Sequence, residues 1–141
     1  MKILVPVDGS EPSLRAVKLA IALAKGARPS DLLLVTVQNL APLGATDLGL
    51  LDPVLVHQAA QRMGEEALRK AVRLVKAAKL RFATKVETGP IAKTLARIAR
   101  NEGVDHIVMG TRGQGGVRGL LLGSVATQLM HLATVPVTLV K

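Results

Sequence analysis

The sequence predicts an α/β fold: a single doubly wound sheet of five parallel strands with helices on both faces. One observation is that short apolar runs without helical period alternate with segments of helical period along the 141 residues. Another is that no linker, repeat or change of composition interrupts this alternation. Because right-handed crossovers place each connecting helix on one face of a parallel sheet, the pattern predicts a sheet covered on both sides. We expect one domain, residues 1–141.

The first half of the chain contains two strands and one helix. Residues 2–7 and 31–37 are continuous apolar runs, which are typical of strands buried on both faces. Between them, Ser10 is suited to cap a helix that stops near Gly26. Residues 38–56 hold several Pro and Gly and show no period, so we expect a long loop there.

The second half continues the alternation. Its first strand is more polar than the others, and we therefore place it at an edge of the sheet. The last helix is expected to begin with Ser124 as its cap and to bury Leu132. The expected elements are a helix at 57–78, the polar strand at 79–87, a helix from Gly89-Pro90 carrying Ile91, Leu95 and Ile98, a strand at 104–109, the helix from Ser124, and a strand at 135–140.

Composition excludes several kinds of site. The chain has no cysteine, which excludes a disulfide scaffold, a thiolate nucleophile and a zinc site built on sulfur. Its three histidines lie on different predicted elements without ligand spacing, so we expect no protein-bound metal site. No stretch reaches the roughly 18 apolar residues of a membrane span. A cytoplasmic protein that does not contact membranes is expected.

The charge balance favours an anionic partner. Nineteen Lys and Arg face ten Asp and Glu, for a formal net charge of +9. The cations are spread over the polar faces of predicted helices, which is typical of a solvated surface. The chain lacks a nucleic-acid recognition motif, and Phe82 is its only aromatic residue. Nucleic acid is therefore not favoured as a partner.

A glycine-rich segment carries the strongest functional signal. Six of the 13 glycines fall in residues 110–123, GTRGQGGVRGLLLG, between a predicted strand and a predicted helix. Free backbone N–H groups and the dipole of a helix N-terminus attract anions at such a position, and phosphate is the natural ligand. Ser124 can add a hydroxyl group, and Arg112 or Arg118 can add a cation.

Other phosphate-binding and phosphoacceptor patterns do not match. A dinucleotide fingerprint beginning at Gly113 meets Arg118 where its third glycine belongs, and the Lys93-Thr94 pair follows Gly89 too closely for a P-loop. A receiver-type signalling domain needs paired acids after the first strand, but Asp8 stands alone there.

The pattern that does match is Gly110-x-x-Gly113, nine residues, then Gly123-Ser124. Together with ILVPVDGS near the start, IVMGTRG at the fourth strand, LLGSVA at the last helix and VPVTLVK at the end, it makes the sequence resemble the universal stress protein family over its whole length. That family has members that bind ATP and members that do not. The glycine pattern is the mark of the ATP-binding branch.

The resemblance implies a strand order of 3-2-1-4-5 and an adenine nucleotide lying across the carboxyl ends of the first and fourth strands. Ligands of open α/β sheets bind at this kind of position. Val7, Val37 and Val125 also fit ordinary core positions, and Asp8 also fits a helix cap. The implied contacts are Pro6, Val7 and Asp8 at the base and sugar, Val37 on the adenine, Met109, Gly110, Arg112 and Gly113 at the ribose and phosphates, and Gly123, Ser124 and Val125 at the phosphate chain.

The resemblance further implies an ATP-binding module for stress response or signalling, with Mg²⁺ arriving on the phosphates. The expected neighbourhood offers Asp8 and Ser124 but no Glu or His, so we expect slow hydrolysis at most and no catalytic residue. Homodimerisation through the strand at 135–140 is implied as well. The alternative is a member that binds no nucleotide and acts as a dimeric interaction protein.

Overall fold

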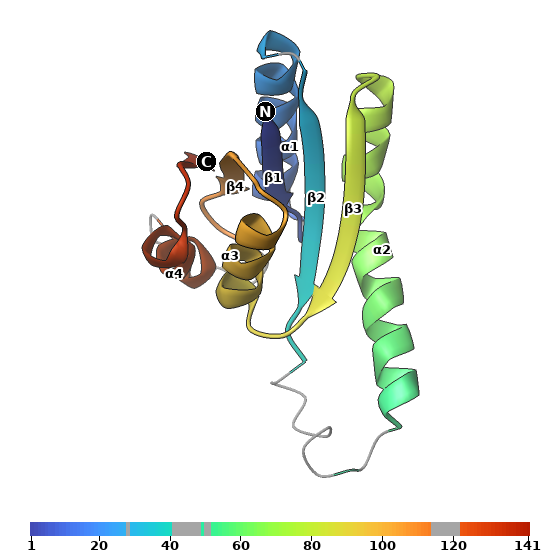
Figure 1. The fold of residues 1–141 in the computed structure, drawn as a ribbon. Helices are drawn as coiled ribbons and strands as arrows, with labels where there is room; N and C mark the ends of the chain where they lie inside the picture. Colours follow the sequence, from blue (N-terminus) through green and yellow to red (C-terminus); the bar gives the residue numbers. More distant parts are fainter. Residues whose placement is uncertain (28, 41–48, 50–51, 114–121) are drawn as a thin grey trace.

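The computed structural model describes residues 1–27, 29–40, 49, 52–113 and 122–141, and they form one five-stranded parallel sheet (Figure 1). The strand order is β3-β2-β1-β4-β5, as predicted. The polar strand β3 lies at one edge, as predicted, and β5 at the other. The elements are β1 (Lys2–Pro6), α1 (Glu11–Gly26), β2 (Asp31–Gln38), α2 (Pro53–Ala77), β3 (Arg81–Thr88), α3 (Ile91–Asn101), β4 (His106–Gly110), α4 (Ser124–Leu132) and β5 (Val137–Val140).

Two helices cover each face of the sheet (Figure 1). Helices α1 and α2 pack on the face that carries Ile3 and Val5, whereas α3 and α4 pack on the face that carries Leu4. These three residues of β1 are 0% exposed, because the strand is paired on both edges and covered on both faces. This explains why β1 is an apolar run without alternation. Among the described residues, no helix is both long and apolar enough to span a membrane.

Helix α2 begins earlier than its hydrophobic period indicates. Residues 53–56, expected in the loop, are helical, so this boundary of the prediction is wrong. The Asp52 carboxylate accepts a hydrogen bond of 2.9 Å from the N–H of Val54, and Pro53 occupies the first helical position. An acidic cap followed by proline is a helix start signal, and it outweighs the loop-like composition before it.

The boundaries near the end of the chain also differ. The expected cap at Ser124 is wrong: Gly123 is the N-cap residue and Ser124 is the first residue of α4. Leu132, expected inside, is 41% exposed because only Ala126 and Leu129 of this short helix are buried. Strands β4 and β5 begin at His106 and Val137, later than the apolar runs that predicted them.

Gly64 allows α2 to lie close to the sheet. A Cβ atom at this position would lie 2.8 Å from Cγ2 of Val86 and 3.0 Å from Cγ2 of Thr36, and closer still to Cγ1 of Val86. Thr36 is buried and has little room to move. The glycine in the middle of α2 is therefore required by the close approach of β2 and β3.

We predict that Gly64→Ala destabilises the protein by about 1–2 kcal/mol, since overpacking exceeds the gain in helix propensity. Thermal and urea unfolding measure the effect. Gly26→Ala is the matched control, because a Cβ atom at Gly26 meets nothing within 4 Å. Equal stability of the two variants would show that α2 shifts at no cost.

Glu102, directly after α3, binds two lysines from different strands. Its Oε2 atom lies 2.9 Å from Nζ of Lys2, and its Oε1 atom lies 2.7 Å from Nζ of Lys85. Lys2 also donates a hydrogen bond of 3.0 Å to the Glu102 carbonyl oxygen. Hydrogen bonds from Lys2 and then Lys85, together with their charges, lower the pKa of Glu102 from 4.5 to about 2.

A lowered pKa means that the folded state holds Glu102 charged where the unfolded chain begins to protonate it. The stabilisation is complete above the unfolded pKa of 4.5 and is lost as the pH falls toward about 2. We therefore predict that Glu102→Gln is less stable than wild type at pH 7 and that the difference shrinks between these two values. Urea unfolding across this range measures it, and a difference that is independent of pH would contradict it.

Candidate functional site

A cavity of about 340 Å³ lies at the carboxyl ends of the strands, where neighbouring β1 and β4 lead to helices on opposite faces. This is the switch point at which open α/β sheets bind ligands. All the residues implied by the resemblance line this cavity: Pro6, Val7, Asp8, Val37, Met109, Gly110, Arg112, Gly113, Gly123, Ser124 and Val125. Their contacts with a ligand stay a prediction.

The three spaced glycines are positions where the backbone approaches another segment closely. A Cβ atom at Gly110 would lie 2.8 Å from Cβ of Pro12, at the start of α1. At Gly113 it would lie 2.5 Å from Oδ2 of Asp8. At Gly123 it would lie 3.3 Å from the carbonyl oxygen of Thr111. The three glycines therefore allow the backbone at the end of β4 to lie close to the turn between β1 and α1 and to the start of α4.

Asp8 organises the turn between β1 and α1. Its Oδ1 atom accepts hydrogen bonds from the backbone N–H of Ser10, at 2.9 Å, and from the Ser10 hydroxyl, at 2.5 Å. Ser10 is the N-cap residue of α1, and its hydroxyl oxygen accepts from the N–H of Ser13 at 3.4 Å. The two interpretations of Asp8 are compatible, because the carboxylate supports the capping turn and also lines the cavity.

The start of α4 supplies the backbone donors of the site. The N–H of Gly123 donates to the Thr111 carbonyl oxygen at 2.7 Å, which fixes the helix start beside the end of β4. The N–H groups in the first turn of a helix have no acceptor within that helix. Ser124 and Val125 both line the cavity there. This arrangement favours an anionic group at the polar end of the cavity.

Part of the cavity lining is apolar, and we call this part the apolar wall. It includes Val37 from β2 and Met109 from β4, together with two residues that were not predicted from the sequence, Ile91 and Leu95 of α3. Both belong to the apolar stripe that predicted α3, but nothing local shows that α3 faces this cavity. Val37 and Val125 also pack against the core on this face, and Val7 belongs to the core on the other, so the core interpretation holds for all three.

Polar residues of β2 and β4 were also missed. Thr36 and Gln38 lie at the end of β2, and Nε2 of Gln38 donates to Oγ1 of Thr36 at 3.3 Å. Thr111 follows β4 and is 8% exposed. These polar residues follow apolar residues at the ends of β2 and β4. Because the ends of adjacent parallel strands meet at one edge of the sheet, this position could have indicated that they line the cavity.

The ionisable side chains around the cavity are few. Among the described residues that line it, only Asp8 and Arg112 are ionisable. Arg118, Gly115 and Gly116 lie outside the described residues. The described lining can hold a base on its apolar wall and an anion on its glycine loop, with Asp8 as its one carboxylate.

A second cavity, of about 540 Å³, adjoins the first. Asp8 and Gln38 line both cavities. The second cavity lies on the side of α2, whose residues Arg62, Met63, Glu66, Ala67 and Lys70 line it together with Gly9.

Fold and site together define an α/β protein with a glycine-lined cavity at the switch point of a parallel sheet. Comparison with known sequences agrees: the universal stress protein family matches residues 1–141. Universal stress protein MJ0531 of Methanocaldococcus jannaschii is 33% identical over 141 residues, covering 99% of this chain and 81% of that protein. The chain belongs to the universal stress protein family.

Solved structures show the same fold. The protein MJ0577, described in a structure-based assignment of biochemical function, has a TM-score of 0.81 at 26% identity, with 99% of this chain and 94% of that chain covered. A universal stress protein in complex with cAMP has a TM-score of 0.70 at 25% identity, covering 99% and 95% of the two chains. Adenine nucleotide binding is thus found in a relative of this chain.

Proposed function

We propose that the chain is a cytoplasmic, ATP-binding universal stress protein that acts through nucleotide-dependent recognition of a partner. The observation that carries the proposal is the division of the cavity of about 340 Å³ into an apolar wall and a glycine-lined polar end. A nucleotide has the same division, since its base is flat and largely apolar and its phosphates are anionic.

The close contact between Gly113 and Asp8 supports the placement of the ribose and phosphates. Gly113 has no side chain, and a Cβ atom there would collide with Oδ2 of Asp8, so the backbone after β4 can lie directly beside this carboxylate. The carboxylate can then accept hydrogen bonds from sugar hydroxyl groups. The start of α4 lies across the same cavity and offers backbone N–H groups to phosphate.

The comparisons support an adenine base. The relative solved with cAMP contains adenine, and its fold covers 99% of this chain. ATP in place of a monophosphate is our inference from the glycine pattern, which is the mark of the ATP-binding branch of the family that the sequence resembles. Mg²⁺ would arrive on the phosphates, and Asp8 is the one carboxylate that the described lining could offer to it.

We infer that hydrolysis of the bound nucleotide is slow at most. Efficient phosphoryl transfer to water requires a group that orients the water and cations that stabilise the transition state. Asp8 is the one carboxylate among the described lining residues, and its Oδ1 atom already accepts two hydrogen bonds from Ser10. The site is suited to holding a nucleotide.

Calorimetric titration with ATP, ADP, AMP, cAMP and GTP, with and without Mg²⁺, tests the proposal. We predict adenine-selective binding by the wild type. Gly113→Val should weaken it by at least about tenfold, since the new side chain displaces Asp8 or the loop. Gly26→Ala, outside the site, should bind as the wild type does.

Thermal unfolding of both variants shows whether they are folded. Lost binding in a folded Gly113→Val variant supports the proposed site. Absence of adenine binding by the wild type would instead favour the alternative, a universal stress protein that binds no nucleotide and acts as a dimeric interaction protein.

We also propose that the chain forms a homodimer through β5. This strand lies at the edge of the sheet, and its residues Val137, Leu139 and Val140 are apolar and only half-buried. Leu132 of α4, just before the connection to β5, is 41% exposed. An exposed apolar strand edge of this kind is a template for pairing with another chain.

Sedimentation equilibrium measures the dimer, and we predict that Leu132→Glu weakens it by placing a charge beside the apolar edge. Val54→Glu is the matched control, because Val54 is an exposed apolar residue, at 62%, at the start of α2. A wild type that stays monomeric at high concentration, or equal weakening by the two variants, would contradict an interface at β5.

A further inference from the structure

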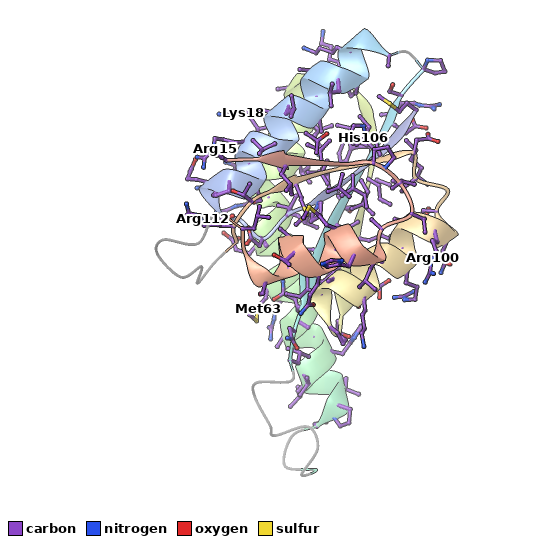
Figure 2. The ribbon with its side chains drawn as sticks, turned by 90° about the vertical axis from the view of Figure 1, so that its left-hand side faces the viewer. Arg15, Lys18, Met63, Arg100, His106 and Arg112 are labelled. Carbon is purple, nitrogen blue, oxygen red and sulfur yellow. The ribbon has the colours of Figure 1, made fainter. Side chains whose placement is uncertain are left out.

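The face of the sheet that α1 and α2 cover holds more Lys and Arg than the face that α3 and α4 cover. Helices α1 and α2 lie side by side there (Figure 1) and hold three and five Lys and Arg, respectively, against one and two Glu. In Figure 2, Arg15 and Lys18 of α1 lie on one side of the sheet and Arg100 of α3 lies on the other. Helices α1 and α2 thus bring eight of the chain's 19 Lys and Arg to one face, and α3 carries three on the other.

Ion pairs distinguish the two faces. On the α3 side, Arg97 pairs with Glu87 at 3.6 Å, and Glu102 pairs with both Lys2 and Lys85. Among the described residues, Arg69 with Glu66 is the one ion pair formed by a cation of α1 or α2. We define the basic face by the exposed cations of α1 and α2 whose side chains form no ion pair and no hydrogen bond with a described residue: Lys18, Lys25, Arg62, Lys70, Arg73 and Lys76.

The positions of these cations form rows along the helices. In α2, Arg62, Arg73 and Lys76 of the basic face, together with the ion-paired Arg69, recur at spacings of three, four and seven residues on the side opposite the buried residues. This row is about 21 Å long, from the rise of the helix, and about six phosphates of one duplex strand cover the same distance. Packed helices lie about 8–10 Å apart, so α1 adds a second row beside the first.

We propose that the basic face binds the phosphate backbone of a double-stranded nucleic acid without reading its sequence. This inference is independent of nucleotide binding in the first cavity. Sequence reasoning did not favour nucleic acid, because it found no base-reading motif and no stacking aromatics. Backbone binding needs neither of these and depends on cations in a regular array.

Other polyanions fit this face less well. A helix that inserts into a lipid surface needs an apolar stripe beside its cations. The exposed large apolar residues of α1 and α2 are Val54 and Leu55, at the N-terminal end of α2, and Met63, which directly follows Arg62. They do not form a stripe along the helix. Single strands are held by aromatic stacking, and Phe82, the one aromatic residue, is in β3 and packs against the core.

Fluorescence anisotropy with a labelled duplex of about 20 base pairs, which is longer than the basic row, tests the proposal. We expect wild-type affinity to fall on the order of 100-fold between about 50 and 200 mM salt, as for about four phosphate contacts. Lys70→Glu/Arg73→Glu should lower the affinity by at least about tenfold at the lower salt concentration. It should also reduce the slope of log affinity against log salt concentration by about two.

The matched control is Lys93→Glu/Arg100→Glu on α3. It makes the same change in net charge at exposed cations on the other side of the sheet. We expect a loss of affinity below about threefold. Thermal unfolding verifies that each variant is folded, and Lys70→Gln/Arg73→Gln replaces the first variant if it is not.

The outcomes are distinct. A selective loss in the α2 variant supports the basic face as the binding surface. Equal losses in both variants would show attraction by net charge alone and would overturn the proposal. Absence of duplex binding would overturn it as well, and so would binding to vesicles of acidic phospholipid without binding to the duplex.

Discussion

The candidate site depends on the close approach of two backbone segments at the carboxyl ends of β1 and β4. Gly110 lies against Pro12, and Gly113 lies against the Asp8 carboxylate, at distances that leave no room for a side chain. The bond from the Gly123 N–H to the Thr111 carbonyl oxygen then fixes the start of α4. If either glycine gained a Cβ atom, the turn before α1 and the loop after β4 would separate, and the cavity between them would lose its polar end.

Features that depend on local sequence could be predicted. The apolar run of β1 reflects the burial of both faces of this strand, and the apolar stripe of α1 reflects the burial of one side of this helix. The spacing of apolar residues in the sequence predicts both. The start of α2 was not predicted, because a proline- and glycine-containing segment runs directly into a helix that the Asp52 cap begins. The cap at Ser124 was misplaced by one residue because glycine can also adopt the extended N-cap conformation.

Only those residues of the candidate site that belong to a recognisable sequence motif could be predicted. The resemblance names the residues at the ends of β1 and β4, and the structure gathers them around one cavity. Ile91 and Leu95 were missed because their part in the cavity depends on how α3 lies across the sheet. The basic face was not predicted for the same reason. Helices α1 and α2 are separated in sequence by β2, and only the handedness of the crossovers places their cations on the same face of the sheet.

The first cavity and the basic face meet at Asp8. This residue lines both cavities, and the second cavity also contains Arg62 and Lys70 of the basic face. Phosphates bound beside Asp8 would add negative charge near these cations and weaken their attraction for a second polyanion. Because linkage is reciprocal, a duplex on the basic face would weaken nucleotide binding by the same factor. Salt would reduce this coupling, since the charges of the basic face are exposed to solvent. Electrostatics alone therefore predicts competition between the two ligands, and cooperative binding would require a change in the turn that Asp8 and Ser10 hold.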